Sequence, residues 1–341
     1  MSRPRRMSPL VSVIMPVHNG ETTVGEAVAS VLAQTYNALE VIVVDNGSTD
    51  CTCDVLAGFH DHRLQISSCP RSGPSASRNL GLSRAAGELV AFIDADDIWL
   101  PAKLSAQLEA LRAAPEAAVA YCWTDYVDPA GDFVCPDSRP TFHGDVHAAL
   151  LAHNFIDSGS NIVVRREPLL EAGGFDESLA VVEDWDLYIR LAARYRFACV
   201  PTALVHYRQS PTSLTNRISL MEECFLRVVE RSFAAAPEEL QHLKPHSMST
   251  FYHYLAGKAT YDCPSRDNGL AALRFFVHAA RHRPRSFLDF PRQSWLVKAL
   301  AKAILSICLP SPVMRWGVRR WPSRRCGASL SPLAHGPEAV G

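Results

Sequence analysis

The strongest constraint on the fold is a regular alternation of short apolar runs and amphipathic stretches between residues 10 and 126. Five apolar runs have the length of strands, at residues 11–16, 39–45, 64–67, 89–94 and 119–126. Three stretches between them carry apolar residues at helical spacing, at 22–34, 75–86 and 101–114. Because continuous apolar strands that alternate with helices are covered on both faces, we expect an α/β fold with a mostly parallel, Rossmann-like sheet.

The rest of the chain predicts a mixed segment followed by helices. We expect strands at 161–165, 197–200 and 203–208, a helix from 183 to 195, and helices from about 216 to 310. Four regions follow from this pattern. They are a disordered N-terminus (1–9), an α/β domain (10–215), a helical C-terminal region (216–321) and a disordered tail (322–341).

Charge is unevenly distributed, although the formal net charge is only −1. Between Arg281 and Cys326 there are eleven Lys and Arg residues and one acid, so the remainder of the chain is acidic. A basic, helical tail suits contact with an anionic surface. Two interpretations stay open: these helices lie in a membrane interface, or they pack on the core with their arginines solvated. We expect no nucleic-acid partner.

The ten cysteines form no CxxC pair and show no spacing typical of a zinc site, so we expect free thiols in a reducing compartment. No apolar segment follows the N-terminal arginines, and no run of about 20 apolar residues exists. The closest approach, 296–309, is interrupted by Lys298 and Lys302. We therefore expect a cytoplasmic protein, at the inner face of the membrane if its C-terminal region binds lipid.

Acidic loops follow several of the predicted strands. In an open α/β sheet, ligands bind at the carboxyl ends of the strands. The residues at these ends are Pro16, Val17, His18, Asn19 and Glu21, then Asp45 and Asn46, then Asp94, Ala95, Asp96 and Asp97. Any one acid could be a solvated loop residue, but three carboxylates within four positions repel one another. They suit Mg²⁺ or Mn²⁺, which such carboxylates usually bind together with substrate phosphates.

Two common nucleotide-binding motifs are missing from the sequence. No GxGxxG follows the first predicted strand and no GxxxxGK[ST] occurs, which argues against a dinucleotide oxidoreductase and a P-loop enzyme. A diphosphate would then be held by the metal and by side chains. Arg71, Arg78 and Arg208 are the candidates, because guanidinium groups pair with phosphate oxygens bidentately.

As a set, the motifs of this chain resemble the family 2 glycosyltransferases of the GT-A fold. They are VSVIMPVHNGE (11–21), VIVVDNGSTD (41–50), GPSASRNLGL (73–82), FIDADDIWLPAKL (92–104), GGFDE (173–177), EDWDLYIRLA (183–192) and VHYR (205–208). The resemblance covers about 200 of the 341 residues in the family's order. It implies a GT-A catalytic domain over 10–215, and an inverting, metal-dependent transfer of sugar from a nucleotide-diphosphate donor.

The resemblance also implies roles for individual positions. The nucleotide would be bordered by Pro16, Val17, Asn19 and Glu21. Its base and ribose would face Asp45 and Asn46. The ribose or the metal would be approached by Asp94 and Ala95. Asp96 would be the ligand of Mn²⁺ or Mg²⁺, and Asp97 would support the loop or cap the next turn. Asn46 stands where the family often has aspartate, but its amide oxygen can accept the N3–H of uracil, so a UDP-sugar is favoured.

Later motifs supply the remaining roles. Asp184 would be the general base that takes the proton of the attacking hydroxyl. The alternative for Glu183 and Asp184 is an acid-rich helix start that the helix dipole favours. Arg208 would contact phosphate, and His206 is either a structural histidine or a further metal ligand.

Three functions therefore remain in competition. The first is a glycosyltransferase acting on a saccharide or lipid-linked acceptor in cell-surface polysaccharide synthesis. The second is a non-catalytic protein that binds sugar nucleotides. The third is a phosphotransferase that uses Asp94 and Asp96, although the enzymes of that kind place the motif after their first strand, whereas here it follows the fourth.

Overall fold

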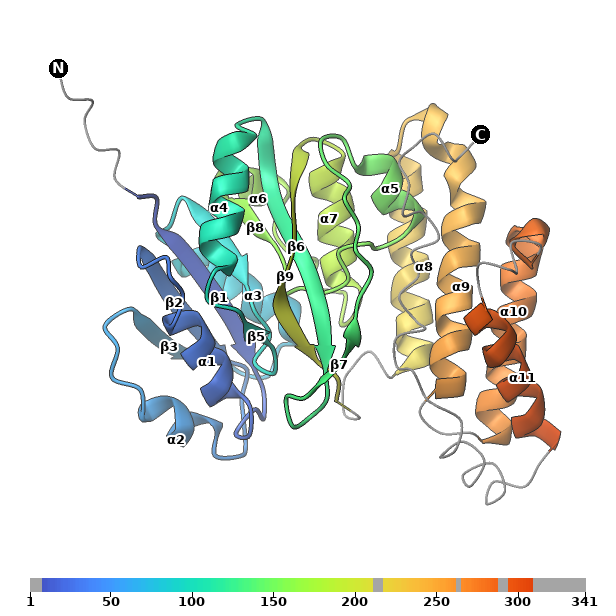
Figure 1. Cartoon of the computed structure of the whole chain (residues 1–341), viewed down its shortest axis with the longest axis horizontal. Coiled ribbons are helices and arrows are strands. Elements are labelled where there is room, and N and C mark those ends of the chain that lie inside the picture. Colours follow the sequence, from blue (N-terminus) through green and yellow to red (C-terminus); the bar gives the residue numbers. More distant parts are fainter. Residues whose placement is uncertain (1–7, 211–216, 262–264, 288–293, 309–341) are drawn as a thin grey trace. The chain divides into compact units, whose positions relative to one another are not determined.

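A computed structural model describes residues 8–210, 217–261, 265–287 and 294–308 of the chain (Figure 1). The chain divides into two compact units. The first comprises residues up to Asp125, Thr141–Val146 and Ile156–Arg208, and the second comprises the rest. The expected α/β fold with a C-terminal helical region is confirmed.

Four parallel strands form one part of the sheet in the first unit. They are β1 (Val11–Val17), β2 (Leu39–Asp45), β3 (Leu64–Ser68) and β4 (Leu89–Phe92). Their order is β3-β2-β1-β4, with every neighbouring pair parallel. The sequence predicted each of these strands. Their carboxyl ends are followed by the loops that carry Asn19, Asn46 and Asp94, as expected for a ligand site.

Beyond β4 the sheet is antiparallel, which corrects the expectation of a mostly parallel sheet. The further strands are β5 (Ile98–Trp99), β6 (Ala117–Val127), β8 (Val163–Arg165) and β9 (Arg196–Arg208). β8 is antiparallel to β4 and to β6, and β5 is antiparallel to β9. Burial on both faces gives a strand the same apolar sequence whatever its direction, so composition could not show the reversal. The two strands expected at 197–200 and 203–208 are one strand, β9.

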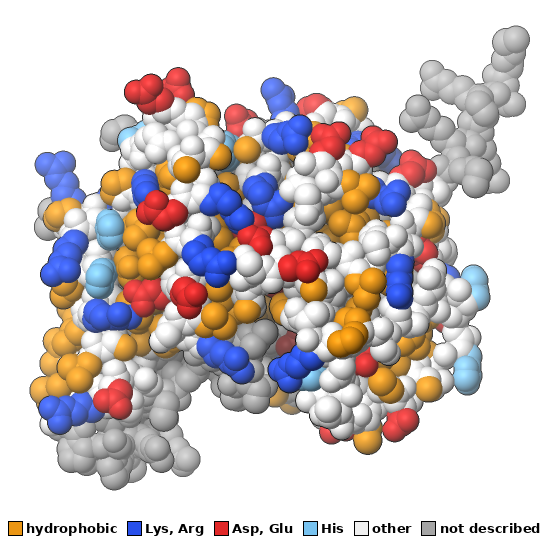
Figure 2. All heavy atoms as spheres, turned by 180° about the vertical axis from the view of Figure 1, so that it is seen from behind, with side chains coloured by type: hydrophobic (Ala, Val, Ile, Leu, Met, Phe, Trp, Pro, Cys, Tyr) orange, Lys and Arg blue, Asp and Glu red, His pale blue; other side chains and the backbone are white. Residues whose placement is uncertain are grey.

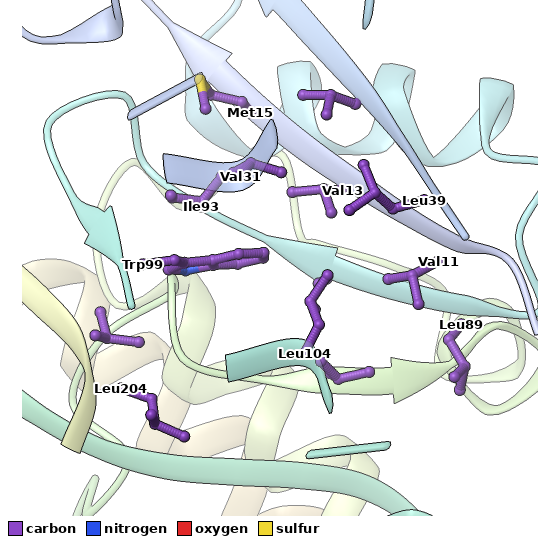
Figure 3. Close-up of a cluster of buried hydrophobic side chains, with 14 of the residues drawn as sticks. Val11, Val13, Met15, Val31, Leu39, Leu89, Ile93, Trp99, Leu104 and Leu204 are labelled. Atoms are coloured by element: carbon purple, nitrogen blue, oxygen red, sulfur yellow. The ribbon is translucent and has the colours of Figure 1, made fainter. Parts of the chain in front are cut away.

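Helices of the first unit cover the sheet. They are α1 (Val24–Leu32), α2 (Thr52–Ala57), α3 (Pro74–Arg84), α4 (Lys103–Ala113), α6 (Arg166–Glu171) and α7 (Glu183–Ala192). Figure 3 shows part of the core, where Val13 and Met15 of β1 lie among Val31, Trp99 and Leu104, all of them buried. Removing such side chains from water is the main favourable contribution to folding.

Helix α3 packs unusually close to the sheet. A Cβ atom at Gly81 would lie 2.4 Å from Cγ2 of Ile14 in β1, so a larger residue would push the helix away. The proline at the start of α3 fits the first turn of a helix, where its missing N–H costs nothing. This close packing fixes the helix that carries Arg78.

The second unit contains helices and one short strand. These elements are β7 (Phe133–Pro136), α5 (His147–Ala152), α8 (Ile218–Ala235), α9 (Lys244–Tyr261), α10 (Arg266–His282) and α11 (Ser294–Cys308), with 3₁₀ turns at Glu238–Leu243 and Pro284–Phe287. α10 crosses α11 closely, because a Cβ at Gly269 would lie 2.7 Å from the carbonyl oxygen of Ala303. In the described parts of the chain, no helix has both the length and the hydropathy needed to cross a bilayer.

Two expectations from the sequence need comment. Residues 1–7 and the tail 322–341, which we expected to be disordered, lie outside the described residues. The expectation of free thiols is wrong for Cys135, which is disulfide-bonded. It holds for Cys51, Cys53, Cys69, Cys122, Cys199, Cys224 and Cys308. Spacing along the chain gave no sign of this disulfide.

Candidate active site

The acidic loop, Asp94–Asp97, follows β4 and is held from both sides. The Asp94 amide donates to Oγ of Ser160 (2.9 Å), and the same hydroxyl donates to the Asp97 carboxylate. The second carboxylate oxygen of Asp97 accepts the Arg208 amide (3.0 Å). Asp97 is therefore a buried support of the loop, as the sequence led us to expect, and its carboxylate has two donors.

Asp96 differs from its neighbour because its side chain is partly exposed. Its main-chain carbonyl accepts Nε of Arg208 (2.9 Å), and within the described residues its carboxylate makes no ion pair. Burial, and then the negative charge of Asp94, raise the pKa of Asp96 to about 6. A nearby cation would reverse this shift.

Arg78 of α3 connects the acidic loop to α7. Nη1 donates to Oε1 of Glu183 and Nη2 to Oδ1 of Asp94, each over 2.6 Å. The guanidinium also lies over the ring of Phe175, 5.2 Å from its centroid. Burial would lower the pKa of Arg78, but the two carboxylates outweigh it and raise that pKa further. This arginine brings the two acidic motifs of the sequence into one site.

Helix α7 begins with a strained residue. Val182, immediately before the helix, has φ 63° and ψ 11°, a left-handed conformation that β-branched residues rarely adopt. Asp184 follows in the first turn, partly exposed, and its Oδ1 accepts the amide of Trp185 (2.7 Å). Burial, and then the neighbouring Glu183 carboxylate, raise the pKa of Asp184 to about 8. Arg78 lowers this pKa and Asp94 raises it, so Asp184 lies within the electrostatic reach of both.

Arg208 ends β9 and holds the acidic loop on its other side. Its Nη2 donates to Glu26 of α1 (2.5 Å), while its Nε and backbone amide donate to Asp96 and Asp97. The side chain is buried. These contacts give Arg208 a structural role, and its contact with phosphate stays a prediction. His206, two residues earlier, lies opposite Ile98 in the ladder of β5 and β9.

Asn19 and Glu21, after β1, bind the loop that follows β2. Asn19 has φ 53°, and its Oδ1 accepts the Thr49 amide (2.8 Å). Oε2 of Glu21 accepts the Cys51 amide (2.9 Å). The structure thus gives both residues a part in shaping this edge of the sheet. Their contact with a nucleotide stays a prediction.

Asp45 and Asn46 are buried at the end of β2. Oδ1 of Asp45 accepts the Ser48 amide (3.1 Å), and Oδ1 of Asn46 accepts the Ser72 amide (2.7 Å). The same oxygen also accepts Oγ of Ser72 (3.4 Å) and Sγ of Cys69 (4.0 Å), so both of its lone pairs have donors in this structure. Pro16 and Val17 pair with Val44 and Asp45 in the ladder, which keeps them at the same edge.

The described site holds more carboxylates than guanidinium groups. Six carboxylates surround Arg78 and Arg208, namely those of Glu26, Asp94, Asp96, Asp97, Glu183 and Asp184. Burial, and then the negative charges of Asp96 and Asp94, raise the pKa of Asp97 well above its ordinary value. No cluster of three or more Asp, Glu, His or Cys side chains suited to a metal occurs among the described residues. A divalent cation here would therefore need ligand oxygens from a substrate.

Two residues of the site were not predicted from the sequence. Ser160 lies in a segment without a recognisable motif, and Glu26 lies on a helix whose pattern indicated only packing. Both act through contacts with distant parts of the chain. Ser160 binds Asp97, which lies 63 positions away, and Glu26 binds Arg208, which lies 182 positions away. No local pattern encodes such contacts.

Comparisons with known proteins find similar glycosyltransferases. An uncharacterised glycosyltransferase of Rickettsia typhi is 32% identical over 188 residues, which are 54% of this chain and 58% of that protein. A UDP-Glc:α-D-GlcNAc-diphosphoundecaprenol β-1,3-glucosyltransferase of Escherichia coli, WfgD, is 40% identical over 100 residues, 29% of this chain and 40% of that protein. The chain therefore matches only about half the length of these relatives.

A solved structure resembles the fold over most of both chains. S. aureus TarS 1–349 in complex with UDP superposes with a TM-score of 0.58 at 21% identity, covering 91% of each chain. A family model described as "Glycosyltransferase like family 2" matches residues 12–259, well over half of the sequence. The chain belongs to this glycosyltransferase-like family 2.

Proposed function

We propose that the protein transfers a sugar from a nucleotide-diphosphate donor to a hydroxyl group of a saccharide or lipid-linked acceptor. The observation that carries this proposal is the Arg78 bridge, because it joins a donor-side carboxylate, Asp94, to the helix that begins with Glu183 and Asp184. A group-transfer enzyme needs its donor and its base within one site.

The donor half of the site would consist of the ends of β1, β2 and β4. Asp45 and Asn46 would bind base and ribose, with Pro16, Val17, Asn19 and Glu21 shaping the edge. Asp94 and Ala95 would face the ribose and diphosphate. UDP is the favoured nucleotide, since TarS was solved with UDP and WfgD is named for UDP-Glc. To accept the N3–H of uracil, Oδ1 of Asn46 would give up its long hydrogen bond from the Ser72 hydroxyl.

Asp96 would hold a divalent cation, Mn²⁺ or Mg²⁺. Its partly exposed carboxylate and the excess negative charge around it suit a hard cation with oxygen ligands. When bound, such a cation would neutralise charge on the departing diphosphate. Arg78 and Arg208 would keep the acidic loop in the orientation that leaves Asp96 accessible.

Asp184 would act as the general base. The acceptor oxygen forms a bond with the anomeric carbon as its proton passes to Asp184. The bond from that carbon to the diphosphate oxygen breaks, and its electron pair leaves with the nucleoside diphosphate. Attack from the face opposite the leaving group inverts the configuration. The raised pKa of Asp184 supports the role, because a base with a pKa near the working pH transfers protons efficiently.

We propose further that the C-terminal helices contact an anionic lipid surface, which suits a lipid-linked acceptor. Large apolar side chains are exposed on α10 and α11, namely Leu270, Val277 and Ile304. Arg281 and Lys298 are exposed on the same helices. Figure 2 shows Lys and Arg side chains beside hydrophobic patches on one face of the molecule. Basic residues with adjacent apolar ones are typical of helices that lie in a membrane interface.

Binding of UDP-sugars, measured by calorimetry with and without Mn²⁺, tests the proposal. We expect the wild type to bind only with the metal, Asp96→Ala to lose this binding, and Asp184→Asn to bind normally but transfer no sugar. Asp54→Asn, an exposed acid on α2, is the matched control and should behave as wild type. Binding without any turnover, in the presence of saccharide and lipid-linked acceptors, would favour the non-catalytic alternative. Metal-dependent phosphatase activity that survives Asp184→Asn would favour the phosphotransferase.

A further inference from the structure

We infer that the segment Ser158–Ser160 is a positioning element that fixes the donor half of the site relative to helix α7. The inference rests on the proposed function, because it assigns the segment to that same site. The segment lies between α5 and β8 and contains none of the motifs. Ser158 and Ser160 are nonetheless almost completely buried, with exposed fractions of 2% and 0%.

Its contact with the donor half runs through Ser160. The Oγ atom accepts the amide of Asp94 (2.9 Å) and donates to the carboxylate of Asp97. The main-chain carbonyl of Ser160 accepts Nε1 of the buried Trp99 (2.9 Å). Ser160 thus forms hydrogen bonds with the first and last residues of the acidic loop and with strand β5, which follows it. Loss of the hydroxyl would leave a buried carboxylate oxygen and a buried amide without their partner.

Its contact with α7 runs through Ser158. The carbonyl oxygen of Ser158 accepts Oη of Tyr188 (2.9 Å), and Tyr188 is 1% exposed. Tyr188 lies one helical turn after Asp184, so the two side chains project from the same face of α7. A hydrogen bond at this position therefore fixes the rotation of the turn that carries the proposed base.

The segment itself is short and rigid, and it lies against the Arg78 bridge. The Ser160 amide donates to Oγ of Ser158 (3.1 Å), which closes the turn. A Cβ atom at Gly159 would lie 3.4 Å from Nη2 of Arg78 and 3.8 Å from Oδ2 of Asp94. A side chain at position 159 would thus contact the ion pair that joins both halves, so the turn lies close to that pair. Displacement of this turn would move Asp94 and Asp184 relative to each other.

Two single-group deletions separate the two contacts. Ser160→Ala removes the hydroxyl on the donor side, and Tyr188→Phe removes the hydroxyl on the α7 side. We expect Ser160→Ala to weaken UDP binding in Mn²⁺ about tenfold, as loss of one well-formed hydrogen bond does. We expect Tyr188→Phe to bind UDP as wild type and to lose about tenfold in the turnover of the bound donor. Ser249→Ala, a buried serine of α9, is the control and should change neither.

A measurement without ligand keeps the inference independent of activity. Hydrogen–deuterium exchange should show the Asp94 amide exchanging at least about tenfold faster in Ser160→Ala than in wild type, because its acceptor is gone. If Ser160→Ala fails to fold, Ser160→Cys replaces it, since the thiol has similar size and bonds weakly. If the Asp94 amide stays as protected as in wild type, or if Tyr188→Phe turns over normally, the inference is wrong. A wild type that binds no UDP-sugar would contradict the proposed function, while the exchange result would still test the segment.

Discussion

Arg78 and Glu183 form a buried ion pair across 105 positions of the sequence, with 2.6 Å between Nη1 and Oε1. The arginine is 3% exposed, so little water screens the interaction. Because the same guanidinium also binds Asp94, its positive charge offsets the repulsion between the two carboxylates. The pair therefore contributes to the stability of the fold as well as to the geometry of the site.

Replacement of Arg78 by methionine should strongly destabilise the protein. Two partly buried carboxylates would lose their common cation, and breaking a buried pair in this way costs about 3–5 kcal/mol. Urea denaturation followed by circular dichroism measures this loss of unfolding free energy. The control is Arg84→Met at the exposed end of α3, which should stay within about 0.5 kcal/mol of wild type. A loss below about 1 kcal/mol for Arg78→Met would contradict the role given to the bridge.

Asp184→Asn should abolish transfer and, at the same time, stabilise the fold. The folded-state pKa of Asp184 is raised to about 8, so folding binds a proton that the unfolded chain releases near its usual aspartate pKa. The contribution of Asp184 to stability is full at low pH and is lost as pH rises toward 8. At pH 8 we expect the asparagine variant to be clearly more stable than wild type, and at pH 4 to equal it. Thermal melts across this range measure the difference.

The neighbouring Asp186 provides the opposite result as a control. It is fully buried, and its Oδ2 pairs with Nη2 of Arg190 over 2.7 Å. Asp186→Asn removes the charge from a satisfied pair, so it should destabilise the fold by about 1–3 kcal/mol at neutral pH. Stabilisation by both substitutions would show that the helix start simply carries too many acids.

The proposed base also predicts the pH profile of the reaction. Asp184 must be ionised to accept a proton, so kcat/KM, which reports the pKa of the free enzyme, should rise with pH. Its inflection should lie well above the ordinary aspartate range and toward 8, because burial and Glu183 raise the pKa of this carboxyl. Steady-state kinetics between pH 5 and about 9 measure it. A rate that is flat above pH 5 would exclude Asp184 as the titrating base.

Acid should weaken the second unit through two buried histidines. Burial, and then the neighbouring His246, lower the pKa of His153 and of His253 to about 4. Their unfolded pKa is about 6.5, so below this pH the unfolded chain binds protons that the folded chain does not. Their contribution is present above pH 6.5 and is lost as pH falls toward 4. Melting temperatures should fall over this window, and His253→Phe should flatten the dependence.

The sequence predicted the parallel part of the sheet well, because β1, β2 and β4 are continuous apolar runs bounded by polar loops. It missed β5 and β7, which have 2 and 4 residues and are too short to show a periodicity. It also divided β9 near Pro201, although the strand is continuous. Strand direction was not predictable, since antiparallel strands that are buried on both faces have the same composition as parallel ones.

For the site, motifs located most of the chemistry but not the contacts that organise it. Asp94 and Asp184 were recognised as important, and the structure brings both within the influence of Arg78. Both terminal nitrogens of Arg78 bind carboxylates, which the motifs did not indicate, and its expected contact with phosphate stays a prediction. Which group an arginine meets depends on the packing of α3 and α7, and no local pattern carries that information.

The long span of the Arg78 bridge has a consequence for biosynthesis. When α3 and β4 leave the ribosome, the partner carboxylate on α7 has not yet been translated. At about 5–20 residues per second, several seconds pass before it emerges. During that interval the nascent domain carries an arginine whose native burial is incomplete, so the Arg78 bridge can form only after nearly the whole first unit is outside the exit tunnel.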